Sequence, residues 1–142
     1  MKERGIKSFS LVILFLFLCS TTWAAKLTVC SSGCGFTTIG AAFSAAANRD
    51  TIEIQDNRIY NETFSNWNKS VTLKSAPGFR ATISRTSVST DTFRLFLVAA
   101  DSCRFENLIL DGVAFNDTTQ RGIEFGGIGK RTGVTIKNVL FK

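Results

Sequence analysis

The spacing of hydrophobic and polar positions changes along the chain. Residues 26–30 (Lys-Leu-Thr-Val-Cys) alternate polar and apolar side chains, as in a short strand. The next apolar positions recur at helical spacing, at Ile39, Ala42, Phe43, Ala46 and Ala47. Thr37 or Thr38 can cap this predicted helix, and the polar stretch 48–50 (Asn-Arg-Asp) ends it.

From residue 51 onward, short apolar runs alternate with polar interruptions. We predict strands at 51–54, 70–74, 81–83, 93–98, 103–110, 122–125 and 133–141. A β-sandwich or a β-solenoid can produce this series. Internal repetition distinguishes the two, because each coil of a solenoid repeats the last.

Pairs of the predicted strands resemble each other. They align at offsets of 31, 30 and 19 residues: 104–110 with 135–141, 93–95 with 123–125, and 51–54 with 70–73. The repeat predicts a solenoid in which inward residues such as Phe105 and Ile136 form an apolar ladder. Asn107 aligns with Asn138, and stacked amides can bond to each other or to turn backbone, so we predict a structural ladder of these two residues at a strand bend.

Residues 1–24 have the features of a secretory signal peptide. Three basic residues precede an apolar run, 9–19, that only one serine interrupts. Thr22 and Ala24 then supply small residues for a cleavage site, so we predict cleavage between Ala24 and Ala25. The run is about half of the roughly 20 apolar residues that a membrane span needs, so we expect no stable span after cleavage and a secreted or extracytoplasmic location.

The remaining residues, 25–142, have a modest positive charge. The chain contains 17 Lys and Arg against 11 Asp and Glu; three of the basic and one of the acidic residues lie in 1–24, which leaves 14 against 10, a net charge of +4. This excess is compatible with acidic glycans, but a solvated face accounts for it equally well, and no run of Lys and Arg predicts nucleic-acid binding. We expect 25–142 to form one domain or part of one.

The start of this region contains a series of motifs: 28–39 (Thr-Val-Cys-Ser-Ser-Gly-Cys-Gly-Phe-Thr-Thr-Ile), the alanines 41, 42, 45 and 46, then 50–54, 60–62 and 68–73. The series resembles the N-terminal region of right-handed parallel β-helix proteins with the pectin-lyase-like fold. The resemblance implies a mainly β fold whose helix caps the open end of the first coil, with Ile39 and Phe43 covering the apolar ladder. Asn48-Arg49 stands where the family often has Pro-Gly.

The cysteines favour a local disulfide. Three residues that include Gly33 separate Cys30 from Cys34, and the leader implies an oxidising compartment. Three single pairings are possible after residue 24; the pair Cys30–Cys34 leaves Cys103 as a small buried residue of a strand. A metal site is disfavoured because the chain has no histidine.

No pattern identifies a catalytic site. The lack of histidine excludes Ser-His-Asp and Cys-His mechanisms within these residues. The resemblance implies that lyases of this fold hold calcium with carboxylates and that its glycosidases use aspartate pairs. Here the aspartates are scattered at positions that suit turns, Asp91, Asp101, Asp111 and Asp117. Gln120 resembles, as a single residue, the catalytic glutamine of pectin methylesterases.

Two kinds of residue have a sugar-related interpretation. Glycosylation sequons begin at Asn61, Asn68 and Asn116, and they matter only in a host that glycosylates them. Tyr60 and Trp67 can stack on sugars, although aromatic residues between a turn and a strand more often pack in a core.

Two functions follow from these observations. The first is a secreted β-helix protein that binds or acts on polysaccharide or a cell-surface glycan through later coils, with calcium as a possible cofactor of the full-length protein. The alternative is a non-enzymatic, adhesin-like structural solenoid. We expect the 142 residues to be catalytically silent and, because they end directly after a predicted strand, to be the N-terminal part of a solenoid truncated at its C-terminus.

Overall fold

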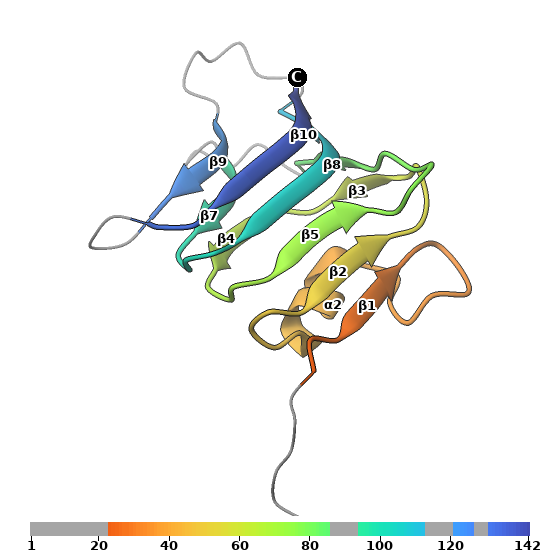
Figure 1. The fold of residues 1–142 in the computed structure, drawn as a ribbon. Coiled ribbons are helices and arrows are strands. Elements are labelled where there is room, and N and C mark those ends of the chain that lie inside the picture. The colour runs from red at the N-terminus through yellow and green to blue at the C-terminus, as the bar shows by residue number, and fades with distance from the viewer. Residues whose placement is uncertain (1–22, 86–93, 113–120, 127–130) are drawn as a thin grey trace, which may run out of the picture.

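The described part of the chain forms a parallel β-solenoid of about four turns with one short helix (Figure 1). The computed structural model describes residues 23–85, 94–112, 121–126 and 131–142. In chain order the elements are β1 (Lys26–Val29), α2 (Ile39–Ala45), β2 (Thr51–Ile54), β3 (Ile59–Asn61), β4 (Phe64–Trp67), β5 (Thr72–Ser75), β6 (Thr82–Ser84), β7 (Arg94–Val98), β8 (Arg104–Asp111), β9 (Arg121–Phe125) and β10 (Thr135–Phe141). The predicted parallel solenoid is therefore confirmed.

The strands of the successive turns lie on three faces. The first face contains β1, β2, β5 and the first halves of β8 and β10, all paired in parallel. The second face contains β3, β6 and the second halves of β8 and β10. The third face contains β4, β7 and β9. The two longest strands therefore bend from one face into the next.

An asparagine lies at each of these bends. Asn107 has φ 56° and Asn138 has φ 51°, a left-handed conformation that asparagine tolerates better than most residues. Asn138 Nδ2 donates to Asn107 Oδ1 at 2.8 Å, and Asn107 Nδ2 donates to the Phe79 carbonyl at 2.8 Å. The two amides thus stack across successive turns and fix the corner.

We expect Asn107→Ala to be less stable than Asn107→Gly by about 1 kcal/mol. Both changes remove the amide ladder, but alanine in the left-handed region costs about 1–2 kcal/mol, and the greater freedom of glycine in the unfolded chain costs about 0.4–1 kcal/mol. Urea unfolding measures the difference. The same two changes at exposed Asn66 in β4 are the control, since the glycine variant should be less stable than the alanine variant there. If the glycine variant were also the less stable one at position 107, the left-handed bend would be contradicted.

The interior is apolar and largely aromatic. The inward side chains of the first face are stacked in register at Leu27, Ile52, Leu73, Phe105 and Ile136. Trp67 is fully buried and Tyr60 is 2% exposed, so both are packing residues and do not present a surface to sugars. The ring of Trp67 contacts those of Phe43, Phe64, Phe96 and Phe105.

The observed register confirms one predicted repeat and corrects two. Residues 104–110 stack under 135–141 at the predicted offset of 31. Thr51 pairs with Thr72, an offset of 21 and not 19, because a shift of two residues preserves the alternation and is hidden in the pattern. Phe96 pairs with Ile123, an offset of 27 and not 30, since Leu95 and Phe96 are both buried and break the alternation on which the alignment depended.

Helix α2 covers the end of the stack next to β1 and β2 (Figure 1). It begins after the N-cap Thr38, whose side chain accepts from Ala41 N at 3.2 Å, and it ends at Ala45, two residues before the predicted end. Its residues Ile39 and Ala42 are buried. The predicted capping helix is therefore present at this end.

Two charged side chains from the first turn hold the ends of α2. The Glu62 carboxylate accepts from the backbone N–H groups of Ile39 at 2.9 Å and Gly40 at 2.7 Å. Lys69 Nζ donates to three carbonyls at the other end, at 2.7–2.8 Å, those of Phe43, Ser44 and Ala46. An acid at the start and a base at the end match the helix dipole and bond to its unpaired backbone groups.

Across the described ranges, from Trp23 to Lys142 with three gaps, no helix is long and apolar enough to cross a membrane.

Candidate functional site

The outer side of the first face is polar on every turn. Parallel pairing aligns its outward side chains in two rows: Lys26, Thr51, Thr72, Arg104 and Thr135 in one, and Thr28, Glu53, Lys74, Glu106 and Lys137 in the other. Parallel strands lie about 4.8 Å apart, so each row presents polar groups at that repeat. The first face is therefore a flat polar surface on an apolar core.

Glu53 is the most enclosed group on this surface. Its side chain is 8% exposed and bonds Lys26 Nζ at 3.1 Å and Lys74 Nζ at 3.2 Å. Burial opposes ionisation of Glu53, but bonds from Gln55, Lys26 and Lys74 outweigh it and hold the pKa of this carboxyl below its usual value. The negative charge of Glu53 is thus paired with Lys26 and Lys74, and it contributes little unpaired negative charge to the first face.

A shallow open depression lies beside this face, at the corner where the chain enters it from the third face. Its lining residues come from three successive turns: Asn48, Arg49, Ser70, Thr72, Ser102 and Arg104. Thr51, Thr72 and Arg104 are paired in register on successive turns. The residues two positions before them, Arg49, Ser70 and Ser102, are therefore neighbours at the corner.

The backbone of this corner is held by bonds between turns. Arg49 has φ 77°, and its N–H donates to the Ser70 carbonyl at 2.6 Å. The Ser70 N–H donates in return to Asn48 Oδ1 at 2.9 Å. Ser102, with φ 56°, repeats this arrangement two turns after Arg49, and its N–H donates to the Thr132 carbonyl at 2.9 Å. The lining residues are therefore placed on fixed backbone.

The depression contains an unpaired cation. Arg104 is bonded to Glu106 through Nη2 at 2.7 Å and Nε at 3.0 Å, and its side chain is 51% exposed. Arg49 is exposed, and among the described residues its guanidinium has no hydrogen-bond or ion-pair partner. None of the six described residues that line the depression is acidic. Two guanidinium groups, three hydroxyls and an amide can therefore receive an anionic, hydroxyl-rich ligand.

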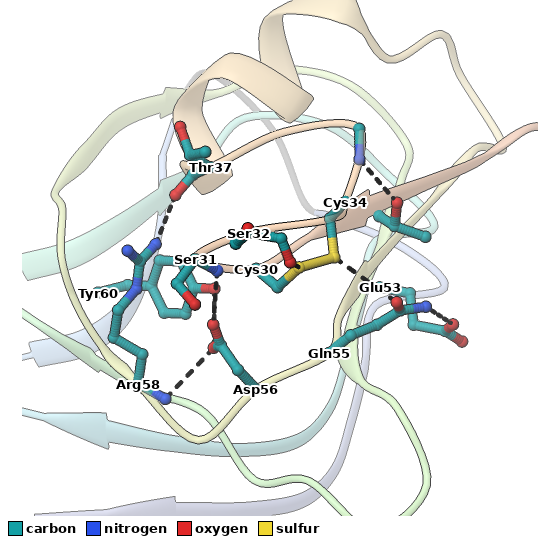
Figure 2. Close-up of a disulfide and its surroundings, with 12 residues drawn as sticks. Cys30, Ser31, Ser32, Cys34, Thr37, Glu53, Gln55, Asp56, Arg58 and Tyr60 are labelled. Atoms are coloured by element: carbon teal, nitrogen blue, oxygen red, sulfur yellow. Dashed lines mark hydrogen bonds between the residues drawn. A yellow bond between two sulfur atoms is a disulfide. The ribbon is translucent and has the colours of Figure 1, made fainter.

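The disulfide lies at a different corner (Figure 2). The predicted bond between Cys30 and Cys34 is confirmed, with a Cα–Cα distance of 5.5 Å. Cys103 is a buried free cysteine, as predicted, and burial raises the pKa of its thiol. Asp56 holds the loop that contains the disulfide, accepting from the Ser31 N–H at 2.9 Å.

Tyr60 also lies at this corner, beside Asp56 and Arg58 (Figure 2). Its hydroxyl donates to Asp56 Oδ1 at 2.9 Å, and the Arg58 guanidinium lies 4.5 Å from the centre of its ring. Burial and the Asp56 carboxylate raise the pKa of Tyr60 to about 12. Arg58 also donates to the Thr37 carbonyl just before α2. These contacts fasten the loop to the first turn.

The remaining candidates from the sequence do not form a cluster among the described residues. Asp101 accepts from the Thr132 N–H at 2.9 Å, which is a turn role, and Asp111 ends β8. Asn61 and Asn68 are exposed. Asp91, Asn116, Asp117, Gln120 and most of the predicted leader, 1–22, lie outside the described residues. Within the described ranges, no group of three or more acidic or cysteine side chains can hold a metal ion.

The depression was not predicted from the sequence. Arg49 was assigned only to the end of a helix and Arg104 only to a strand, and they are 55 positions apart. Correct stacking of Thr51 on Thr72 is the signal that would have brought these two arginines to one corner.

Comparison with known protein families, with curated proteins and with solved structures finds no match to the chain.

Proposed function

We propose that this protein is an exported solenoid that binds an acidic polysaccharide on its first face, with the corner depression as the main point of contact. The observation that carries the proposal is the exposed Arg49, which has no partner among the described residues, beside Arg104 in a depression whose described lining offers hydroxyls and no carboxylate.

The side chains of the depression suit the groups of an acidic sugar. A planar guanidinium can bond two oxygens of a carboxylate or sulfate at once. Ser70, Thr72 and Ser102 offer hydroxyls that both donate and accept, and Asn48 offers an amide. The depression can thus bind both the anionic group of a sugar and the hydroxyls next to it.

The rest of the first face supports a polymer as the ligand. Its outward residues and corner include five cations, Lys26, Arg49, Lys74, Arg104 and Lys137, against two acids, Glu53 and Glu106. These surface charges attract an anionic chain, and weak contacts repeated on successive turns add to its affinity.

Export is supported by the leader pattern and by the disulfide, which persists in oxidising compartments. The resemblance to pectin-lyase-like proteins supports carbohydrate as the ligand class. We propose ligand binding for this surface because its described lining residues, Asn48, Arg49, Ser70, Thr72, Ser102 and Arg104, are hydrogen-bonding and cationic groups.

We expect Arg49→Asn and Arg104→Gln each to weaken binding of polygalacturonate about tenfold, which is about 1.4 kcal/mol. Asparagine suits position 49 because it tolerates the positive φ there. Titration calorimetry on the exported full chain measures the change, with sulfated dextran as a second acidic ligand and unmodified dextran as the neutral comparison.

Lys137→Gln is the matched control, since it removes one outward charge from the same face but lies outside the depression. We expect less than a threefold loss for it. Equal losses in all three variants would reduce the site to general surface charge, and undiminished binding in the arginine variants would contradict the site. Binding of no glycan at all would favour the structural, adhesin-like alternative.

A further inference from the structure

Asp50 is a nearly buried carboxylate next to the residue that precedes β1. The residue is 6% exposed. Its Oδ1 accepts from the backbone nitrogen of Ala25 at 2.7 Å, and its Oδ2 accepts from the backbone nitrogen of Ala47 at 2.7 Å. One side chain therefore connects the residue before β1 to the segment that follows α2.

Backbone hydrogen bonds fix three segments around this carboxylate: the residue before β1, the segment after α2 and the start of β5. The Thr51 N–H donates to the Ala25 carbonyl at 2.8 Å, and the Asp50 N–H donates to the Ala47 carbonyl at 3.2 Å. The Thr72 N–H donates to the Asp50 carbonyl at 3.0 Å. The distance from Ala25 N to Asp50 is thus set by the cap and by two successive turns.

No cation in the described part of the chain pairs with Asp50. Lys26 Nζ bonds Glu53, whose other oxygen bonds Lys74. Lys69 Nζ bonds carbonyls at the end of α2, and the Arg49 side chain is exposed. Asp50 therefore has two neutral amide donors, whereas a buried carboxylate is usually paired with a positive charge.

We propose that the missing charge is the α-ammonium of Ala25, created when the leader is removed between Ala24 and Ala25. The proposal rests on the export part of the proposed function. A leader-cleaving protease of the exporting membrane adds water across that peptide bond. The hydroxyl joins the carbonyl carbon of Ala24, which departs as a carboxylate, and the Ala25 nitrogen takes up protons to become an ammonium group.

The new ammonium group would lie within hydrogen-bond distance of the Asp50 carboxylate. Trp23 is 85% exposed and Ala24 and Ala25 are also exposed, so the bond is accessible to a protease. The Ala25 nitrogen already lies 2.7 Å from Asp50, so cleavage converts an amide donor into a charged one without a change of position. Charge-assisted hydrogen bonds are stronger than neutral ones, so processing locks the first strand against the cap.

The test uses the full chain expressed with its leader and purified from the exported fraction, with mass spectrometry to identify its N-terminus. Wild type is compared with Asp50→Asn and with Asp101→Asn, a matched change at an exposed aspartate that also accepts a backbone bond. An amine-reactive ester at pH 7 then reports the reactivity of the Ala25 amine. We expect labelling at least tenfold slower in wild type and Asp101→Asn than in Asp50→Asn.

The pH dependence of the melting temperature is the second measurement. Pairing with a carboxylate favours the protonated amine, so its contribution is fully present below the usual α-amino pKa of about 8 and is lost as pH rises through the folded value. We expect the difference in melting temperature between wild type and Asp50→Asn to be large at pH 7 and smaller at pH 10. Lys26, Lys69, Arg49 and Glu53 are present in both proteins, so their direct titration cancels in the difference.

Each outcome supports or overturns the proposal. An N-terminus other than Ala25 overturns it together with the predicted cleavage site, while glycan binding is judged by its own experiment. An Ala25 terminus with equal labelling and a difference in melting temperature independent of pH overturns the ion pair but leaves export intact. If Asp50→Asn does not fold, native wild type is compared with urea-unfolded wild type: slow native labelling supports the pair, and equal labelling overturns it.

Discussion

Replacing Trp67 with alanine is expected to lower the free energy of unfolding by about 3–5 kcal/mol. The Trp67 ring is fully buried, lies 4.0 Å from that of Phe43 on the cap, and touches rings from three strands, β4, β7 and β8. Its loss would leave a cavity that the fixed backbone of the first face, the third face and the cap cannot fill. Urea unfolding followed by circular dichroism measures the change.

Trp67→Phe provides the control, and its expected cost is smaller, about 1 kcal/mol. Trp67 Nε1 is buried and has no acceptor in the described residues, so phenylalanine removes an unpaired donor that itself costs about 1–3 kcal/mol. That gain offsets part of the lost volume. A phenylalanine variant as unstable as the alanine variant would show that the indole N–H has a partner, and the account of this cluster would be wrong.

Replacing Lys69 with methionine is expected to cost about 2–4 kcal/mol. Methionine keeps the length of the apolar stem but removes all three bonds to the carbonyls at the end of α2, and a bond to a charged group contributes about 1.5–3 kcal/mol. The estimate is below the sum of three bonds because Ser44 is exposed and its carbonyl can be hydrated. The melting temperature and urea midpoint measure the loss.

Lys137→Met is the matched comparison for Lys69, because Lys137 is exposed on the outer side of the first face. Its expected effect is within about 0.5 kcal/mol. Hydrogen exchange of the α2 amides adds a local measurement: protection should fall in the Lys69 variant and remain in the Lys137 variant. Unchanged protection in both would mean that the helix is held by its apolar face alone.

The sequence predicted those elements whose side chains follow a simple period. The bounds of β2 were predicted correctly because Ile52 and Ile54 alternate with polar residues. Thr37 or Thr38 was predicted to cap the helix, and the structure has Thr38 as the cap. The strands β3 and β4 were missed. β3 has only three residues, and the inward side chains of β4, Phe64 and Trp67, are three positions apart because the register shifts between them.

The depression and the helix clamp required information that no local pattern contains. Lys69 is more than twenty positions from the carbonyls that it bonds, and its type is that of an ordinary surface residue. Arg49 and Arg104 meet only because three turns stack in a particular register. A two-residue error in the first repeat placed Ser70, and not Thr72, beside Thr51, which was enough to hide the site.

Successive turns of the solenoid differ in length while their stacking stays constant. The step from Thr51 to its partner Thr72 takes 21 residues, and the step from Thr72 to Arg104 takes 32. Most of the increase enters between the second and third faces: Tyr60 precedes Phe64 by four positions, whereas their stacked partners, Ile83 and Phe96, are thirteen apart. This corner accepts additional sequence without altering the first face, which makes the coil a natural display scaffold for an inserted peptide.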